Sequence, residues 1–404
     1  IGEIFVRRDE FARRNIVECL PYILITGTMM DYFERKDSNK VSVVMLATGG
    51  GPCRLGQYYR AFEDLIRKKG IKDAAVLTLT DENGYGGLGA GALLKGWEGV
   101  LLSDLFEDVK SVVRAAAKDP EKGLEIIDAA WNDALLYFEG KSEGGLSRLL
   151  KRIAERFSGI KLERELDEIP VVSLIGEIFV RRDEFARRNI VEYIESRGFA
   201  VRVAPVSEYM EYGNFVVNSG LGEREFTAME HLKMRITAAV QKLWEKRIKG
   251  RLSKTGLIHP ELLEVDRTIK GIEHIMNRNF RGEAILTVGL GMREILQPSC
   301  GVISIGPFGC MYSRIAESIL KSEMSFEGKK RTGAYLGETK DCFRPEDKLP
   351  FLAVETDGKP FPQIVEANLE VFVMRAKRTF DRIKGRSGCC GSSSERTALS
   401  AAER

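Results

Sequence analysis

Several features that mark other classes of protein are scarce or absent in this 404-residue chain. No uninterrupted apolar run approaches the roughly 20 residues that span a bilayer, and the chain start lacks the apolar segment of a secretory signal peptide. Lysine and arginine number 62 and aspartate and glutamate 59, so no strong net charge favours nucleic acid or an anionic membrane as a partner. We therefore expect a cytoplasmic protein that binds neither nucleic acid nor membrane.

Histidine and cysteine are also sparse. The three histidines have no closely spaced histidine or cysteine neighbours, which argues against a tetrahedral zinc site. The cysteines number seven, and an odd count without a secretory signal argues against a disulfide framework. A bound metal would therefore need thiolate ligands. The 40 glycines, by contrast, are more than the usual share of about 7% and predict turns in which the backbone approaches a ligand closely.

One segment occurs twice without change. IGEIFVRRDEFARRNIVE fills residues 1–18 and again 175–192, and the copies diverge completely after it. Ancient repeats drift and extend over whole structural units, which this one does not. The second copy fits a β-α-β pattern, with a helix capped by Asp183 between strands at 171–180 and 199–206, whereas the first has lost half of its strand. The identity favours a recombination or fusion product over a genuine duplicated element.

Apolar runs alternate with helical patterns along the rest of the chain. Further strands are predicted at 41–47, 74–80, 284–289, 301–306 and 351–357, and residues 92–160 have mostly helical spacing. Runs that are apolar on both faces predict an α/β fold with two open, mostly parallel sheets covered by helices. We expect a duplicated segment 1–18 that is not native to this position, a first α/β domain 19–165, and a second α/β domain 166–384 with a helical insert 223–276. Residues 385–404 are expected to form a disordered tail. Charges of alternating sign in the basic insert indicate a solvated helix face.

Two cysteines share a local setting that suits chemistry. Cys53, in Gly-Gly-Pro-Cys-Arg, and Cys310, in Gly-Pro-Phe-Gly-Cys, each follow a predicted buried strand and precede a helix. Ligands of open α/β sheets bind at that edge, and a helix N-terminus stabilises an anionic thiolate. Because Arg54 and Arg314 follow them, we expect the pKa of both thiols to fall.

Other residues near the same edge are candidates for the site. Gly51 and Gly309 would let backbone N–H groups approach a sulfur atom or a cofactor. Glu82, Tyr85 and Glu355 lie at or beyond strand ends and are candidate catalytic residues of the same cleft. Taken singly, each of these three side chains has the character of a solvated loop residue.

Cys19 and Cys300 add candidate thiols. Cys300 begins the strand that ends near Cys310, and about ten residues of extended chain hold two thiols ~30 Å apart unless the segment turns, so Cys300 is the weaker fourth ligand. Cys342 is unassigned, and the adjacent Cys389 and Cys390 lie in the predicted tail.

No ATP site is expected in this chain. The glycine-rich turn Thr48-Gly-Gly-Gly-Pro-Cys-Arg-Leu-Gly lacks the Gly-Lys-Ser/Thr ending that grips phosphate and Mg²⁺. We also find no actin-like nucleotide fold at the start of the chain, which begins at Ile1 without methionine, as a truncated chain would. ATP hydrolysis, if it drives this protein, is expected on another polypeptide or on a missing part.

An ordered set of motifs resembles the 2-hydroxyacyl-CoA dehydratase superfamily. The chain is most similar to the region, related to the dehydratase D-component, that forms the C-terminal part of large CoA-substrate-specific enzyme activases. The resemblance covers about residues 18–384. Its motifs are Glu18-Cys-Leu-Pro, Gly51-Pro-Cys-Arg-Leu-Gly-Gln-Tyr, Glu82-Asn-Gly-Tyr-Gly-Gly-Leu-Gly, Ile175-Gly-Glu-Ile-Phe-Val-Arg-Arg-Asp-Glu-Phe, Gly306-Pro-Phe-Gly-Cys-Met-Tyr-Ser-Arg-Ile-Ala-Glu and Glu355-Thr-Asp-Gly-Lys-Pro-Phe-Pro-Gln.

The resemblance implies an oxygen-sensitive protein with a cysteine-ligated 4Fe-4S cluster between two Rossmann- or flavodoxin-like subdomains. Cys19, Cys53 and Cys310 match the family's cluster ligands; Cys300, substrate, solvent or sulfide would fill the fourth position. Electrons would come from an ATP-hydrolysing activator protein or domain. In the family, one electron delivered to an acyl-CoA thioester gives a ketyl radical that can lose a β-positioned hydroxyl. A dehydratase (lyase)-type component, acting as a homo- or heterodimer, is therefore expected.

The chain departs from the family pattern in places, and alternatives remain open. Ile16-Val-Glu-Cys replaces the usual Gly-Lys-Glu-Cys, Tyr312 stands where the family usually has proline, and the tail after Lys384 matches nothing in the family. One alternative is an ATP-coupled reductase of small molecules with a double-cubane cluster, which would need about six thiolates. Another is a cluster-free interaction domain of an activase.

Overall fold

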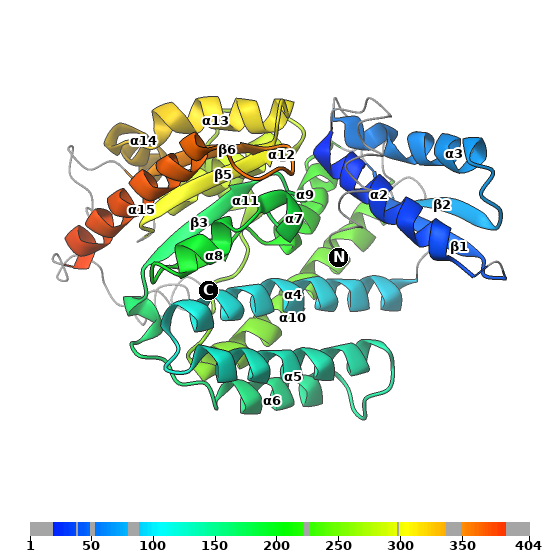
Figure 1. The fold of residues 1–404 in the computed structure, drawn as a ribbon, viewed down its shortest axis with the longest axis horizontal. Helices are drawn as coiled ribbons and strands as arrows, with labels where there is room; N and C mark the ends of the chain where they lie inside the picture. Colours follow the sequence, from blue (N-terminus) through cyan, green and yellow to red (C-terminus); the bar gives the residue numbers. More distant parts are fainter. Residues whose placement is uncertain are drawn as a thin grey trace.

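The computed structural model describes residues 19–37, 39–48, 53–79, 89–221, 227–296, 299–336 and 349–384. The chain is an α/β protein with two small parallel sheets, which Figure 1 shows at the right and at the upper left, both above a layer of long helices. The expectations for residues 1–18 and for the tail 385–404 fall outside the described residues.

The first sheet has two strands, β1 (Ser42–Ala47) and β2 (Ala74–Leu79), paired in parallel from Ser42 opposite Ala74. Both strands were predicted. The helices α2 (Leu20–Arg35) and α3 (Tyr58–Lys68) pack with this sheet, and the 3-10 turn η1 (Arg54–Gln57) leads directly into α3. Tyr58, Phe62 and Ile66, spaced four apart, form the buried stripe of α3. Together these elements form what we call the first lobe, and it has an apolar core of its own.

The predicted helical stretch 92–160 is confirmed. It forms α4 (Ala90–Ala116), α5 (Pro120–Phe138) and α6 (Leu146–Phe157). The start of α5 is specified locally, because Pro120 occupies the first turn and the Asp119 side chain accepts a hydrogen bond from the N–H of Lys122 at 3.1 Å. The apolar core of these helices also includes Ala200, Ile248 and Leu252, so packing continues across the predicted boundary at residue 165.

The second sheet has four parallel strands in the order β4-β3-β5-β6. The strands are β3 (Val171–Gly176), β4 (Ala200–Val203), β5 (Gly301–Pro307) and β6 (Phe351–Thr356). Since β4 lies on one side of β3 and β5 on the other, the chain changes direction across the sheet between β3 and β5. The carboxyl ends of two such strands diverge into a crevice, which is where parallel sheets bind ligands.

Helices cover the second sheet and connect its strands. They are η2 (Leu166–Glu168), α7 (Glu184–Arg187), α8 (Ile190–Glu195), α9 (Val206–Asn218), α10 (Ala228–Leu252), η3 (Ser253–Thr255), α11 (Val265–Gly271), α12 (Glu283–Glu294), α13 (Met311–Glu323), α14 (Phe326–Leu336) and α15 (Gln363–Lys384). Among the described residues no helix combines the length and the apolar character needed to cross a membrane.

Two local predictions were wrong. Residues 284–289 form the start of helix α12 instead of a strand, because an apolar run this short fits a buried helix as well as a buried strand. The predicted helix after Asp183 is interrupted. Asp183 does cap α7, accepting from the N–H of Ala186 at 2.8 Å, but Arg188 has a positive φ of 55° and separates α7 from α8.

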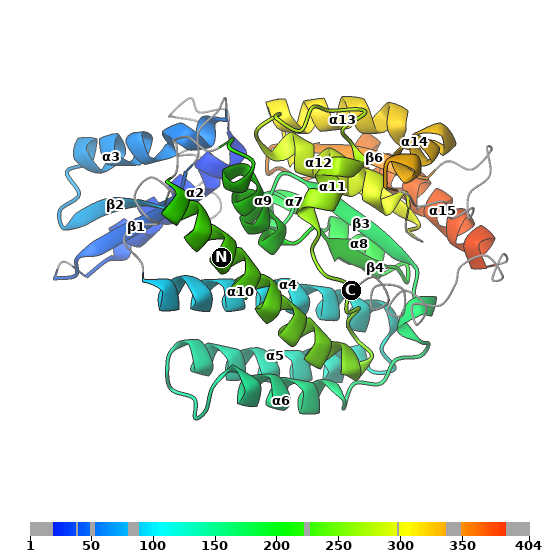
Figure 2. The ribbon, with the colours of Figure 1, turned by 180° about the vertical axis from the view of Figure 1, so that it is seen from behind.

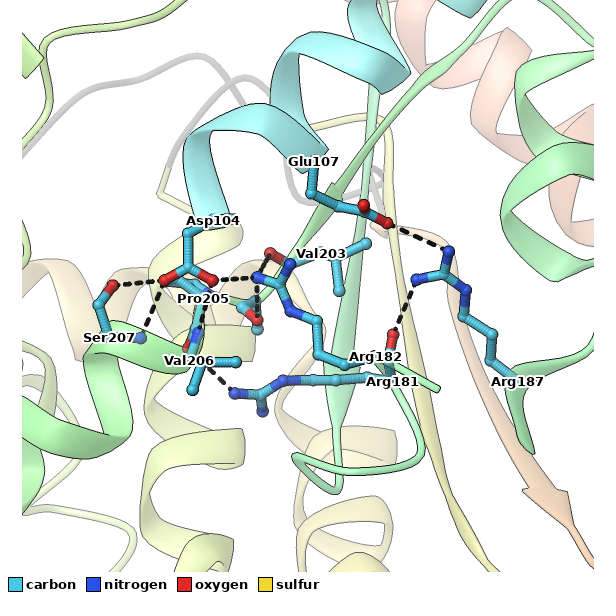
Figure 3. Close-up of polar contacts among 10 residues, drawn as sticks. Asp104, Glu107, Arg181, Arg182, Arg187, Val203, Pro205, Val206 and Ser207 are labelled. Carbon is cyan, nitrogen blue, oxygen red and sulfur yellow. Dashed lines mark hydrogen bonds and ion pairs between the residues drawn. The ribbon is translucent and has the colours of Figure 1, made fainter. Parts of the chain in front are cut away.

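A network of charged side chains joins α4 to the second sheet (Figure 3). The Asp104 carboxylate accepts hydrogen bonds from Arg182 at 2.7 Å, from the backbone N–H groups of Val206 and Ser207 at 2.9 Å, and from the Ser207 hydroxyl at 2.7 Å. It therefore caps α9 from another part of the chain. Arg187, in the segment after β3, makes a second connection to α4 by donating to Glu107 at 3.1 Å.

We expect Asp104→Ala to lower the free energy of unfolding by about 3 to 5 kcal/mol. It leaves the N–H groups of Val206 and Ser207 without their acceptor and takes from the Arg182 guanidinium its carboxylate partner, so that this group keeps the backbone carbonyls of residues 203 and 204. Urea unfolding followed by circular dichroism measures the loss. Asp64→Ala removes an ion-pairing carboxylate from the surface of α3 and is the control, with an expected loss of at most about 1 kcal/mol. Equal losses in the two variants would contradict the central role of Asp104.

Candidate functional site

Three of the candidate cysteines occupy the same kind of position. Cys19 directly precedes α2, Cys53 precedes η1 and the continuous α3, and Cys310 precedes α13. Each has an extended backbone and is the N-cap residue of its helix. All three side chains are half-buried. The positions predicted for Cys53 and Cys310, after a strand and before a helix, are therefore confirmed, and Cys19 has a related setting.

The fold brings these three thiols close together. An ionised Cys310 raises the pKa of Cys19, and ionised Cys19 and Cys310 both raise the pKa of Cys53. Such charge effects weaken with distance, so the three thiols form one group although they lie far apart in the sequence. Cys53, from the first lobe, packs with Cys310 against the apolar core around α12 and α13. The group therefore lies where the first lobe meets the second sheet with its helices, which we call the second lobe.

The expected fall in thiol pKa was wrong for Cys53. Burial raises the pKa of Cys19 and of Cys53 and is the largest influence on both. The N–H groups of Tyr22 and Leu55 do lower the pKa of these thiols, as expected at a helix start, but their effect is smaller. Both thiols are therefore neutral near pH 7 unless a metal ion displaces their protons.

The turn that carries Cys310 is held by Glu355, at the end of β6. Its carboxylate accepts a hydrogen bond from the Arg314 guanidinium at 2.5 Å and one from the Gly309 N–H at 3.2 Å. Gly309 has a φ of +70°, a conformation that favours glycine. These three residues were predicted to contact a cofactor or substrate. Their contacts with one another fix the backbone on both sides of Cys310, and their contact with a cofactor or substrate stays a prediction.

Cys300 does not join the other three thiols. It is buried at the amino end of β5, where its N–H donates to the Val171 carbonyl at 2.8 Å, and Cys310 follows the carboxyl end of the same strand. Burial raises its pKa to about 12. The extended strand keeps the two cysteines apart, as the sequence indicated, so the structure gives Cys300 a core position.

The remaining predicted residues have little structural description. Arg54 is exposed on η1. Gly51, Glu82, Tyr85 and the cysteines at 342, 389 and 390 lie outside the described residues, and their roles stay predictions.

A pair of buried carboxyl groups near the thiols was missed by the sequence analysis. Glu177 directly follows β3, and its carboxylate accepts from the N–H groups of Phe179 and Val180 at 3.2 and 2.8 Å. Glu283, at the start of α12, accepts from the N–H of Ile178 at 2.6 Å. Burial raises the pKa of both carboxyls, and the charge of Glu177 raises that of Glu283 further, to about 8. An ionised Glu177 raises the pKa of Cys19, and an ionised Glu283 that of Cys53.

The backbone that leads into Glu177 is tightly constrained. Gly176 has a φ of +116°, and a Cβ atom there would lie 2.0 Å from the Ile305 carbonyl oxygen, so only glycine fits. Arg181 is buried beside both carboxyls, donates to the Gly176 carbonyl at 2.6 Å and lies 3.8 Å from Glu283. The position of Glu177, just past a buried strand, is the same signal that identified Cys310, and it would have revealed this residue.

Tyrosine side chains surround the thiols. The Tyr58 hydroxyl lies 2.7 Å from the Cys19 sulfur. Burial, and then the charge of an ionised Cys19, raise the pKa of Tyr58. Burial also raises the pKa of Tyr209 and Tyr312, and an ionised Cys53 raises both further. All three phenols therefore stay protonated, so the tyrosines add no charge to the surroundings of the thiols.

The donor set suits an iron-sulfur cluster better than a single metal ion. In the described part of the chain no three His, Cys, Asp or Glu side chains are arranged to hold one ion. A 4Fe-4S cluster takes one thiolate on each iron, so its ligands do not have to converge on one atom. The three half-buried thiols are ligands of the type that such a cluster takes.

A separate cavity of about 150 Å³ lies between α4, β4 and the start of α9. Its lining combines apolar side chains with many charged ones, among them Asp108, Arg202 and Glu208, and none of the three cysteines contributes to it. Burial raises the pKa of Asp108 to about 6 and that of Glu208 to about 7. The thiols lie elsewhere, where the lobes meet.

Comparison with known proteins gives no relative: no family model matches the chain, and no curated protein or solved structure matches it significantly.

We expect Glu283→Gln to flatten the pH dependence of stability. The pKa of Glu283 in the folded chain, about 8, lies above its ordinary value of 4.5, so between these pH values the folded chain holds a proton that the unfolded chain releases. The free energy of unfolding therefore falls as pH rises through this window. The glutamine variant lacks this loss and should be more stable than the natural chain by about 1 to 4 kcal/mol above pH 8, and nearly equal to it at pH 5.

Urea unfolding at a series of pH values measures this difference. Glu63→Gln, at an exposed position on α3, is the control and should follow the natural chain at every pH. A glutamine variant at 283 with the same slope as the natural chain would show that Glu283 ionises normally in the folded state.

Proposed function

We propose that this chain is an iron-sulfur redox protein of the 2-hydroxyacyl-CoA dehydratase or CoA enzyme activase type, which binds a 4Fe-4S cluster through Cys19, Cys53 and Cys310. The observation that carries the proposal is the meeting of these thiols, each at the start of a different helix and from both lobes. The two parallel sheets are consistent with the Rossmann- or flavodoxin-like subdomains that the family resemblance implies.

The structure supports three protein ligands from the described residues and leaves the fourth position to solvent, substrate or another residue. When bound, the cluster would supply single low-potential electrons for the radical dehydration of an acyl-CoA. The chain's own residues would control its surroundings. Tyr58 places its hydroxyl at the Cys19 sulfur, Glu355 and Arg314 hold the Cys310 turn, and the half-buried setting limits water.

Protons have a defined place in this proposal. The Glu177 and Glu283 carboxyls are buried near the thiols, and their raised pKa values keep a proton on the pair near neutral pH. Arg181 is buried beside them and offsets part of the negative charge. The pair would therefore hold a proton close to the site at which charge changes when the cluster is reduced.

Electrons would come from an ATP-hydrolysing activator protein or domain, acting on this chain as part of a homo- or heterodimer. Exposed apolar side chains next to Cys310 support the approach of another protein: Phe308 is 69% and Met311 44% exposed. An electron donor that contacts Phe308 and Met311 would lie within a few residues of Cys310, one of the proposed cluster ligands.

Iron content and spectroscopy after anaerobic purification test the proposal. We expect about four iron and four sulfide per chain and an EPR signal on reduction. Cys53→Ala and Cys310→Ala should each abolish the visible absorption of the cluster, because each removes a thiolate ligand. Cys300→Ala is the matched control, since it removes a buried thiol at the far end of β5, and it should retain the absorption.

Other outcomes have clear meanings. About eight iron per chain would favour the double-cubane alternative, and a chain that never binds iron would leave only the cluster-free interaction domain. Equal loss of absorption in all three variants, with circular dichroism spectra unchanged, would refute the ligand assignment.

Glu355→Ala should lower cluster occupancy several-fold without removing a ligand, because the Cys310 turn loses the acceptor for both Gly309 and Arg314. The measurement is iron per chain and the rate at which a chelator bleaches the visible absorption. Glu317→Ala is a close control: Glu317 also pairs with Arg314, at 3.3 Å, but sits within α13 and pairs with Lys321 as well. Occupancy in Glu355→Ala equal to that in Glu317→Ala would show that the turn needs no such support.

A further inference from the structure

An apolar stripe on α10 lies exposed on the outside of the molecule. Its members are large side chains that are each more than half exposed: Met229 at 61%, Leu232 at 52%, Ile236 at 55% and Leu243 at 59%. Figure 2 shows α10 running across the surface in front of α4. Large apolar side chains in a continuous row on a surface mark an interaction site, whereas scattered single ones do not.

The helix that carries this stripe is specified by its own sequence. Thr227 and Glu230 form a complete capping box at its start, in which the Thr227 hydroxyl accepts from the Glu230 N–H and the Glu230 carboxylate accepts from the Thr227 N–H. Further along, Gln241 contacts the body of the protein, where its carbonyl accepts from the Trp97 ring N–H at 3.1 Å, and Ile248 and Leu252 are fully buried. The stripe lies on the opposite side of α10 from these buried residues.

The spacing of the stripe suits a partner helix. Met229, Leu232, Ile236 and Leu243 are separated by three, four and seven residues, which is the a/d spacing of a heptad, with Ala239 at the remaining position. A stripe restricted to a and d positions is the narrow seam of two packed helices. Insertion into a membrane surface favours a wider apolar sector.

Charges beside the stripe decide what kind of helix fits. The positions flanking it in the heptad carry Lys233, Arg235 and Lys242. Lys242 already pairs with acidic side chains of the protein body, so Lys233 and Arg235, both exposed, supply the charge available to a partner. The two acidic residues of α10 are engaged elsewhere: Glu230 closes the capping box, and Glu245 is buried with Lys249 and the Leu263 N–H. A second copy of α10 would bring basic flanks against basic flanks, whereas glutamate at the partner's flanking positions would pair with them.

We propose that the outward face of α10 binds an amphipathic helix of another protein, with apolar residues at its a and d positions and acidic residues beside them. This surface is distinct from the thiol site, since none of the three cysteines is on or next to α10. The proposal therefore stands or falls independently of the iron-sulfur assignment.

A designed peptide tests this surface directly. The probe is a fluorescent helix of about three heptads with leucine at a and d and glutamate at e and g, titrated with the full chain and followed by fluorescence anisotropy. We expect saturable binding that Ile236→Asp weakens at least about 10-fold. Ile364→Asp is the matched control, because Ile364 is also an exposed apolar residue, on α15, and this change should leave binding intact.

Charge reversal distinguishes specific helix pairing from nonspecific hydrophobic binding of the peptide. Lys233→Glu combined with Arg235→Glu should weaken the glutamate peptide and strengthen a peptide with lysine at the same positions. Circular dichroism confirms that each variant is folded.

Three outcomes would overturn the proposal. One is a glutamate peptide that binds no more tightly to the natural chain than to Ile236→Asp. Another is a dimer in light scattering that Ile236→Asp dissociates, which would assign the stripe to a second copy. The third is binding to phosphatidylserine vesicles that Ile236→Asp abolishes while the peptide does not bind, which would assign it to a membrane surface.

Discussion

The arrangement of this protein depends on one carboxylate, that of Asp104. From the middle of α4 it accepts a hydrogen bond from the Arg182 guanidinium and caps the start of α9. It therefore joins α4 to two of the segments that follow strands of the second sheet. Arg182 belongs to the turn that follows β3, and that turn carries Glu177 and Arg181 toward the thiols. A carboxylate with four donors in a buried setting is stable only while all of them stay in place. The geometry near the thiols is therefore maintained from a point well away from them.

The duplicated segment shows how far sequence identity differs from structural equivalence. Two arginines of residues 175–192, Arg181 and Arg187, are among the most buried large side chains of the described residues, and each donates to a backbone carbonyl and pairs with an acidic residue. Those partners, Glu107 and the turn after β3, are already engaged by this copy. The meaning of these residues comes from what surrounds them, which is why an identical string at 1–18 does not by itself predict a second such unit.

Much of the fold could be predicted from the sequence, because buried parallel strands are short apolar runs bounded by glycine and proline. Residues 42–47, 74–79 and 301–307 met that description, and Cys53 and Cys310 could be placed from it. The run at 284–289 also met that description but is helical. A segment buried on all sides is apolar at every position, so the hydrophobic period that distinguishes a helix from a strand is lost. The pKa of the Cys53 thiol was misjudged because a local helix start is visible in a sequence, whereas the side chains that bury Cys53 come from distant segments. The Glu177 and Glu283 pair was missed for the same reason.

The three N-cap cysteines also have a mechanical consequence. Two of them belong to the first lobe, which has its own apolar core, and the third begins a helix of the second sheet. A metal group held by all three would add a bonded connection between lobes that already share an apolar contact, since Leu20 and Leu24 of α2 pack into the core of the second sheet. Loss of that group would weaken the joint between the lobes, and reloading would require the three thiols to come together again. The rate of metal uptake would then report on the motion between the lobes as much as on the chemistry of sulfur.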